Sequence, residues 1–293
     1  MPHLLFSYTN GNTEVKIFDD GTKVRTYEGI PAPDFPESMD VKITNWCDAG
    51  CHWCHEESTT KGQHANLAPT LDLIKQMPKG CEIAIGGGHP LSHPGFEDFV
   101  KELTLHGIIC NVTINEKHFE KELPRIESLV GQGFLKGVGY SYKDKPCTWK
   151  YEHLVTHVII GVTGPEELER ILQVNNKVLL LGYKDYGRGK GFHTRKSEEV
   201  DRNIKAWYHI HALKEACIKA RISMDNLAIE QLNPKRLYVR NPEAYNEAYM
   251  GEEGTFSMYM DAVREEYAVC SFDPYRRSYG ASLSEMFKGV TRK

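Results

Sequence analysis

From residue 39 onward, short apolar runs alternate with amphipathic stretches, and this alternation limits the possible folds of the chain more than any other feature. Six buried strands are expected, at 39–44, 82–85, 108–114, 138–142, 157–162 and 177–181. Helices are expected between and after them, notably at 96–105, 119–130 and 197–219. Strands that alternate with helices form right-handed β–α–β units around a parallel sheet. The pattern therefore predicts an α/β fold, in which six such units would make an open, partial barrel.

Two different segments flank this core, so we expect three parts. Residues 1–36 would form a small β appendage and linker, because alternating residues at 15–18 and 23–27 flank an Asp-Asp-Gly-Thr turn. Residues 37–225 would form the core. Residues 226–293 would form a C-terminal extension with a β-hairpin between strands at 255–260 and 266–271. In a fold of this kind, chemistry lies at the C-terminal ends of the parallel strands.

The charge and hydropathy of the chain argue against several classes of protein, namely secreted, membrane-spanning and strongly basic nucleic-acid-binding proteins. The formal net charge of −4 gives no general attraction to nucleic acid or to anionic membranes. No stretch approaches the roughly 20 apolar residues that a membrane span needs. The opening residues, MPHLLFS, do not continue into the apolar run of a secretory signal. We therefore expect a cytoplasmic protein, in a compartment where thiols stay reduced.

Three of the eight cysteines lie close together, in a loop directly after the first expected strand. The segment Cys47-Asp48-Ala49-Gly50-Cys51-His52-Trp53-Cys54 has the spacing C-x3-C-x2-C. Three thiolates this close can bind one metal centre. A 4Fe–4S cluster has four irons that each need an outer ligand, so three cysteines leave one iron open to a cofactor or substrate.

Three other interpretations of the loop have to be weighed. Residues 51–55 also fit C-x-x-C-H, the c-type haem attachment signature, but that use normally lies outside the cytosol and leaves Cys47 unexplained. Three cysteines with His52 or His55 could bind structural zinc, although no second ligand pair follows at standard spacing. They could also be ordinary thiols, as is expected for most of the five scattered cysteines, at 81, 110, 147, 217 and 270.

The cysteine spacing resembles the radical S-adenosylmethionine (SAM) superfamily, whose motif is C-x3-C-x-aromatic-C, with Trp53 at the aromatic position. The resemblance implies a partial (β/α)6 TIM-like barrel. It also implies a 4Fe–4S cluster on Cys47, Cys51 and Cys54, with SAM on the open iron and its adenine near Trp53. No cysteine follows Cys270, so a single cluster is expected.

Further SAM contacts are implied by the same resemblance. The second strand ends in Gly86-Gly87-Gly88-His89-Pro90, where the family usually has Gly-Gly-Glu-Pro for the SAM amino group. His89 replaces the acid, and a neutral imidazole accepts a hydrogen bond without bringing negative charge. Ser141, at the end of the fourth strand, is the candidate for the SAM ribose or carboxylate. The backbone at Gly182 and Tyr183 is the candidate for adenine.

The resemblance also implies the reaction. The reduced cluster would cleave SAM to methionine and a 5′-deoxyadenosyl radical, which abstracts hydrogen from the substrate. The cofactor carries that chemistry, and the protein orients the reactants and excludes water. An electron donor of the flavodoxin or ferredoxin type is implied as a partner, and no further catalytic residue is assigned.

The substrate is less constrained. A peptide or protein residue is favoured by the hairpin extension and by the N-terminal β appendage, which offers an edge for strand addition. A nucleotide, nucleoside or tRNA is the alternative. It is suggested by the basic, glycine-rich residues 184–196, which also suit other anionic small molecules, and by a basic and aromatic tail of Tyr275, Arg276, Arg277 and Tyr279. A non-catalytic metal-binding protein is the third possibility.

Overall fold

The computed structural model of the chain describes residues 2–209, 222–249 and 251–291, which form two β-sheets and the helices around them. The smaller sheet is antiparallel with strand order β1-β2-β3, from β1 (Leu4–Asn10), β2 (Thr13–Phe18) and β3 (Lys23–Tyr27). The hairpin predicted at 15–27 is therefore present as β2–β3, with β1 as an additional strand beside it.

The larger sheet has ten strands in the order β10-β9-β8-β7-β6-β5-β4-β11-β12-β13, and β4 to β11 all run parallel. The six predicted strands correspond to β4 (Ser38–Thr44), β5 (Glu82–Gly87), β6 (Ile109–Asn115), β7 (Gly137–Ser141), β8 (Leu154–Ile159) and β9 (Val178–Leu181). The predicted α/β class with a parallel sheet is thus confirmed. The largest shift is at β8, which begins three residues before the expected 157.

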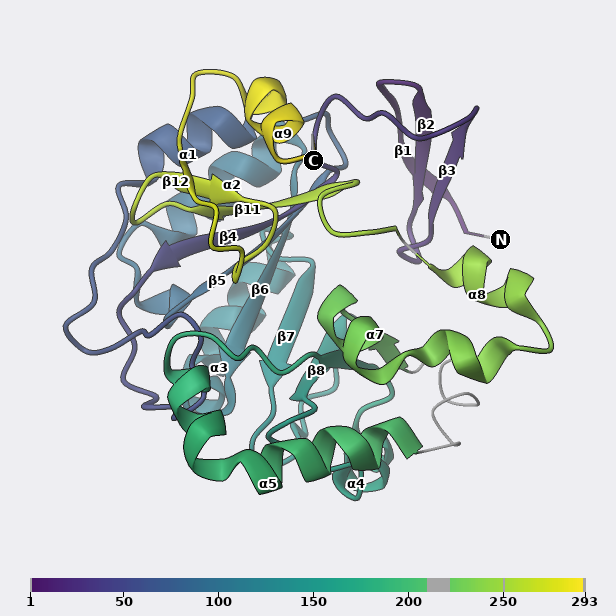
Figure 1. The fold of residues 1–293 in the computed structure, drawn as a ribbon. Coiled ribbons are helices and arrows are strands. Elements are labelled where there is room, and N and C mark those ends of the chain that lie inside the picture. Colours follow the sequence, from purple (N-terminus) through teal and green to yellow (C-terminus); the bar gives the residue numbers. More distant parts are fainter. Residues whose placement is uncertain (1, 210–221, 250, 292–293) are drawn as a thin grey trace.

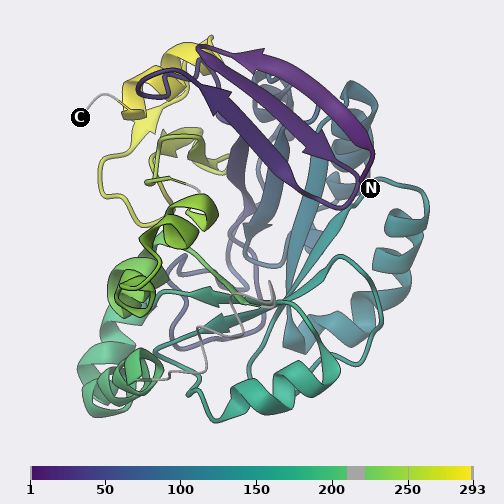
Figure 2. The same cartoon turned by 90° about the vertical axis from the view of Figure 1, so that its right-hand side faces the viewer.

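Helices cover one side of the large sheet (Figures 1 and 2). They are α1 (Leu67–Ile74), α2 (Phe96–His106), α3 (Glu116–Gly131), α4 (Glu167–Val174) and α5 (Arg188–His209). Alternate strand residues such as Val41 and Ile83 are buried in the core with side chains of these helices. The intervening residues, including Asp40, Lys42 and Glu82, project from the other face of the sheet. Among the described residues, none of the helices is both long enough and apolar enough to cross a membrane.

Residues 184–196, expected to form a basic loop, differ from that prediction. The chain is helical from Arg188, and one α5 residue, Lys196, has non-helical dihedral angles where two helical segments meet. The remainder of the long helix predicted up to residue 219, together with Cys217, lies outside the described residues.

The C-terminal region contributes to the same large sheet. After β10 (Ile222–Met224) come α7 (Asn226–Leu232), α8 (Pro242–Ala248), β11 (Ser257–Asp261), β12 (Glu266–Ala268), β13 (Arg277–Ser278) and α9 (Leu283–Thr291). The predicted hairpin is present as the antiparallel pair β11–β12. Strand β11 also pairs in parallel with β4, and this places Asp261 opposite Lys42. The extension therefore completes the pairing of the strand that precedes the cysteine loop.

A buried ion-pair network stabilises the contact between β4, β11 and the cysteine loop. The Nζ atom of Lys42 lies 2.7 Å from Glu56 Oε2 and 3.0 Å from Asp261 Oδ2, and all three side chains are largely buried. The hydroxyl of Tyr259 donates to Glu56 Oε1 at 2.9 Å. Since Glu56 follows Cys54 closely in sequence, one ammonium group connects β4, β11 and the cysteine loop.

The small sheet packs against the amino ends of the parallel strands. Arg25 of β3 pairs with the fully buried Glu37, just before β4, at 2.8 Å. Lys23 pairs with Glu82, the first residue of β5, at 3.1 Å. The β2–β3 turn borders a cavity of about 440 Å³ against the helix-free face of the large sheet. Figure 2 shows the small sheet across this end of the molecule.

The Lys42 network provides a stability test. Lys42→Met would leave two buried carboxylates without their cation, and we expect the free energy of unfolding to fall by about 3–5 kcal/mol. Lys288→Met is the control, because it breaks an exposed pair with Asp34 and should cost about 1 kcal/mol or less. Urea denaturation of both variants measures the difference. Equal losses would contradict a structural role for the network.

Candidate functional site

The cysteine loop begins where β4 ends, at the carboxyl end of the parallel strands. Its backbone is held by neighbouring segments: Cys47 N–H donates to Thr59 O at 3.0 Å, and Asn45 N–H donates to Gln63 O at 2.9 Å. Gly50 has φ = 71°, a left-handed conformation that favours glycine. Cys47, Cys51 and Cys54 are all partly exposed, whereas Cys81, Cys110 and Cys147 are buried. Among the described cysteines, only Cys270 shares the partial exposure of the three motif thiols.

The three thiols of the loop lie close enough to influence one another's ionisation. Burial raises the pKa of the Cys47 and Cys51 thiols, and the neighbouring Cys54 thiol raises both further. A positive metal centre would offset this repulsion between thiolates. In the part of the chain that the structure describes, no three histidine, cysteine or acidic side chains converge as ligands of one metal ion. The cysteines of a 4Fe–4S cluster each bind a different iron, so they need not converge on one point as the ligands of a single zinc ion do.

The glycines after β5 pack closely against the start of the loop. A Cβ atom on Gly87 would lie 2.5 Å from Thr44 O, and one on Gly88 would lie 2.1 Å from Trp46 O. Gly88 N–H donates to Thr44 O at 2.8 Å, and His89 N–H donates to Trp46 O at 2.7 Å. A Cβ on Gly86 would meet no atom within 4 Å. Gly87 and Gly88 are therefore required for packing, and Gly86 leaves open space.

His89 lies in a buried pair of stacked imidazoles. Its ring packs on that of His118 in α3, with centroids 4.0 Å apart and planes at 18°. Its Nε2 atom lies 3.3 Å from Glu122 Oε1. Its Nδ1 atom is buried and has no hydrogen-bond partner among the described residues. Burial, with the adjacent His118, lowers the pKa of His89, so this imidazole is neutral near pH 7.

The first turn of α3 holds the cysteine loop from one side. His118 Nε2 lies 2.5 Å from Asp48 Oδ1, and Lys117 Nζ donates to the Asp48 carbonyl oxygen. The Asn115 side chain caps α3 by accepting from Lys117 N–H, and its Nδ2 donates to Cys51 Sγ at 3.6 Å. One helix start therefore contacts both a loop carboxylate and a motif thiol.

Arg188, at the start of α5, holds the loop from the other side. Its guanidinium donates to Cys51 O at 3.1 Å and to Ser58 O at 2.9 Å, and its backbone N–H donates to Cys54 O at 3.2 Å. Asn115 and Arg188 were both missed by reasoning from the sequence. The one indication for Asn115 is its position directly after the predicted strand 108–114. Arg188 lies in the basic segment 184–196, which the sequence analysis associates with anionic substrates and not with the loop.

The remaining predicted residues are Trp53, within the loop itself, and three residues at or just after the ends of β7 and β9. Trp53 packs edge-to-face on Phe192 of α5, with centroids 5.8 Å apart. Ser141 ends β7 and pairs in register with Asn115. After β9, Gly182 N–H donates to Asp225 Oδ1 at 2.9 Å and Tyr183 N–H donates to Gln231 Oε1 at 2.8 Å. These two backbone donors are therefore already engaged within the protein.

The C-terminal extension also reaches the loop. Ser271 Oγ lies 3.2 Å from His55 Nε2 and accepts from Lys184 Nζ at 2.8 Å. Part of the basic tail is used internally: Arg276 donates to Ser271 O and lies over the Tyr259 ring, and Tyr279 OH lies 3.2 Å from Thr70 Oγ1. Tyr275 of the same tail is exposed.

Comparison with known proteins gives a likeness in fold. No family model matches the chain, and no curated protein matches it. The crystal structure of Streptococcus suis SuiB bound to the precursor peptide SuiA is similar, with a TM-score of 0.53 and 13% identity over 87% of this chain and 65% of that one. SuiB bound to S-adenosylmethionine is similar with a TM-score of 0.50, 13% identity, and coverage of 84% and 64%. The chain spans less than two thirds of SuiB.

The fold and the position of the cysteine loop are compatible with the resemblance seen in the sequence. A parallel α/β sheet carries a C-x3-C-x2-C loop at the carboxyl end of β4, and its fold is similar to that of a protein solved with SAM. At 13% identity, this likeness is one of fold alone.

The α3 contacts can be tested on the metal-free protein. His118→Ala removes the partner of Asp48 and the stacking partner of His89, and we expect the amides of residues 47–54 to exchange hydrogen about tenfold faster, equivalent to about 1.4 kcal/mol of lost local stability. His106→Ala, at the end of α2, is the control. Hydrogen exchange measured by mass spectrometry reports both. Unchanged exchange in His118→Ala would show that α3 does not hold the loop.

Proposed function

We propose that this protein is a radical SAM enzyme in which Cys47, Cys51 and Cys54 hold one 4Fe–4S cluster, and that its core is a partial (β/α)6 barrel. The observation that carries the proposal is the loop of three partly exposed cysteines at the carboxyl end of the first core strand. When bound, the cluster supplies one electron for the reductive cleavage of SAM to methionine and a 5′-deoxyadenosyl radical. An external flavodoxin or ferredoxin would supply that electron.

The proposed SAM contacts use the groups that the fold leaves open. The space over Gly86 leaves room beside the carbonyl groups of Gly86, Gly87 and Gly88, which would accept from the SAM amino group. His89 would contribute through Nδ1: with its proton on Nε2 toward Glu122, a neutral imidazole offers Nδ1 as an acceptor. The ammonium of SAM would then meet an uncharged acceptor instead of the acid usual in the family.

The other proposed contacts come from Trp53 of the loop and from the ends of β7 and β9. Trp53 would border the adenine, and the Ser141 hydroxyl would meet the ribose or carboxylate. Gly182 and Tyr183 would border the adenine through surfaces other than their N–H groups, which are used by Asp225 and Gln231. Asn115 would donate to the Cys51 sulfur of the bound cluster, as it does to the thiol. Hydrogen bonds to cluster sulfurs are one means of setting the reduction potential.

We propose a residue of a peptide or protein as the substrate. Two observations support this choice: the small sheet has an open edge at β3, and SuiB, which is similar in fold, was solved with a precursor peptide. Exposed edges bind extended peptides through main-chain hydrogen bonds.

Anaerobic reconstitution with iron and sulfide tests the enzyme proposal. We expect a brown protein that, after reduction, forms 5′-deoxyadenosine from SAM, measured by liquid chromatography. Cys51→Ala should lose the cluster absorbance and this product, because one iron loses its ligand. Cys147→Ala, at a buried thiol, is the matched control and should keep both.

Two outcomes would contradict the assignment. A colourless protein that binds zinc would make the loop a structural metal site. SAM cleavage at the original rate by Cys51→Ala would show that this cysteine is not a ligand.

A further inference from the structure

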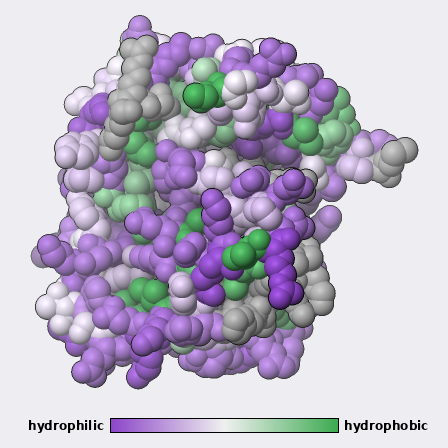
Figure 3. Space-filling view, turned by 45° about the vertical axis from the view of Figure 1, so that its right-hand side comes forward, coloured by the Kyte–Doolittle hydropathy of each residue, from purple (hydrophilic) through white to green (hydrophobic). Residues whose placement is uncertain are grey.

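A cavity of about 440 Å³ lies on the helix-free face of the large sheet. The β2–β3 turn borders its outer end, and residues farther along β6, β7 and β8 form its inner end. Its walls are mainly apolar and include Ala84, Val155 and Leu179. They differ from the surface in Figure 3, which is mostly hydrophilic with small separate apolar patches. The cavity has the size and character of a site for a small ligand group.

Two glycines of β7 allow polar side chains to lie flat on this face. A Cβ atom on Gly137 would lie 2.5 Å from Asn111 Oδ1, and one on Gly139 would lie 2.6 Å from His157 Cε1. A larger residue at either position would push the neighbouring side chain away from the sheet. Strand β7 therefore fixes the places of Asn111, from β6, and His157, from β8, at the cavity wall.

The two polar side chains differ in their partners. Asn111 is occupied, because its Oδ1 accepts from Gly137 N–H at 2.7 Å and its Nδ2 donates to Glu82 Oε2 at 3.5 Å. Neither ring nitrogen of His157 forms a hydrogen bond with another described residue. Burial lowers the pKa of His157 to about 4, so its imidazole is neutral near pH 7. A neutral imidazole has one N–H donor and one acceptor nitrogen, and both are unused here.

The surroundings of His157 carry no balancing charge. Burial is the cause of its lowered pKa, and no charged side chain of the described residues contributes. Of the charged residues that line the cavity, Glu82 is paired with Lys23 at 3.1 Å. Residues 19–20 and Lys136 lie at the outer end and are exposed. The inner end therefore suits an uncharged polar group, because a charged one would be buried there without a partner.

His157 also lies next to the proposed cofactor site. It pairs in register with Ser141, the last residue of β7, which we propose to contact the ribose or carboxylate of SAM. Because alternate residues share a face, Ser141 projects from the same side of β7 as Gly139, against which the imidazole packs. A group that is hydrogen-bonded to His157 would therefore lie beside bound SAM.

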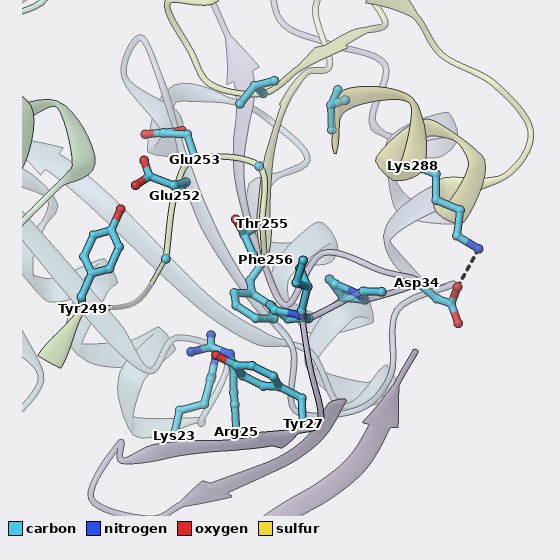
Figure 4. A pocket seen from close by; sticks show the side chains of 18 of the residues that line it. Lys23, Arg25, Tyr27, Asp34, Tyr249, Glu252, Glu253, Thr255, Phe256 and Lys288 are labelled. Atoms are coloured by element: carbon cyan, nitrogen blue, oxygen red, sulfur yellow. Dashed lines mark ion pairs between the residues drawn. The ribbon is translucent and has the colours of Figure 1, made fainter. Parts of the chain in front are cut away.

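Two further cavities lead from this one to the surface. It shares residues of β5 and β6 with a cavity of about 270 Å³, namely Glu82, Ala84 and Asn111. That cavity shares Glu253 and Val269 with a groove of about 1110 Å³. Figure 4 shows this groove, with Tyr27 on one side and Tyr249 and Glu252 on the other. A side chain of a larger molecule can thus approach His157 from outside.

We propose that the cavity receives an aromatic side chain of the substrate that carries an O–H or N–H group, and that His157 accepts the hydrogen bond from that group. The inference rests on the proposed function, because it identifies the substrate residue that would lie beside SAM. Tyrosine and tryptophan combine a large apolar ring, which the walls would cover, with one donor for the unused imidazole nitrogen. A ring without a donor would leave this nitrogen unpaired, so His157 determines specificity.

Three soluble probes test the proposal on the reconstituted protein with SAM present and no reductant. They are the N-acetyl amides of tyrosine, tryptophan and phenylalanine, of which the phenylalanine side chain has no donor. In ligand-detected NMR titrations, we expect the Kd of the tyrosine and tryptophan probes to be about tenfold lower than that of the phenylalanine probe, as expected for one buried hydrogen bond. Equal Kd values for the three probes would overturn the proposal, and so would failure of the tyrosine and tryptophan probes to bind.

Variants of His157 connect the preference to the imidazole. His157→Phe keeps a ring over Gly139 and removes both nitrogens, so it should raise the Kd of the tyrosine and tryptophan probes about tenfold. Unchanged binding of the phenylalanine probe would show that this variant is folded. His157→Gln offers an amide oxygen as acceptor and should restore part of the preference. His153→Phe, at the outer end of the same cavity, is the matched control and should keep the preference. An unchanged preference in His157→Phe would contradict the assignment.

A cavity-filling variant locates the probes. Ala84 is exposed to the open space over the sheet, and Ala84→Leu would occupy part of the cavity. All three probes should then bind about tenfold more weakly. Binding at the original Kd would mean that the probes lie elsewhere and that the cavity is not their site.

The same preparations separate this inference from the enzyme proposal. Formation of 5′-deoxyadenosine by a protein that binds none of the probes refutes the role of the cavity and leaves the enzyme proposal intact. Selective binding of the tyrosine and tryptophan probes by a protein that does not cleave SAM has the opposite meaning.

Discussion

The site depends on the position at which β4 ends. This strand is hydrogen-bonded to β5 on one side and to β11 on the other, so its carboxyl end is fixed from both directions. The cysteine loop leaves from that end, and Gly87 and Gly88 pack against the same residues, Thr44 and Trp46. A change in the register of either neighbouring strand would move the loop relative to the glycines. The parallel pairing is therefore what brings two segments, distant in sequence, into one site.

The sequence was sufficient for the parallel sheet and for the location of the loop. Apolar runs of strand length, separated by amphipathic segments, indicated β4 to β9, because short apolar runs that alternate with helical patterns are typical of the strands of a parallel sheet. The partnership between β11 and β4 could not be predicted, since about 215 residues separate them and no local pattern encodes the pairing. Asn115 and Arg188 could not be assigned for the same reason: each contacts the loop through tertiary packing, and their residue types are common at helix starts and in basic segments.

The charges at the two ends of the parallel strands are arranged differently. At the carboxyl ends, buried charge is balanced locally, as for Lys42 between Glu56 and Asp261. At the amino ends, Lys23 and Arg25 are balanced by Glu82 and Glu37, but Glu253 and Asp40 have no ion-pair partner among the described residues. This difference separates the end of the molecule that carries the cysteine loop from the end that the small sheet covers.

The β4–β11 pairing also bears on when the protein can mature in the cell. Residues 257–261 leave the ribosome long after the cysteine motif, since more than 200 residues are translated between them. Until they emerge, β4 has an unpaired edge and the Lys42 ammonium lacks one of its two carboxylates. The loop reaches its final geometry only after translation of the hairpin, so binding of the cluster that we propose would be a post-translational event. An iron–sulfur delivery system serving this chain would act on the completed polypeptide.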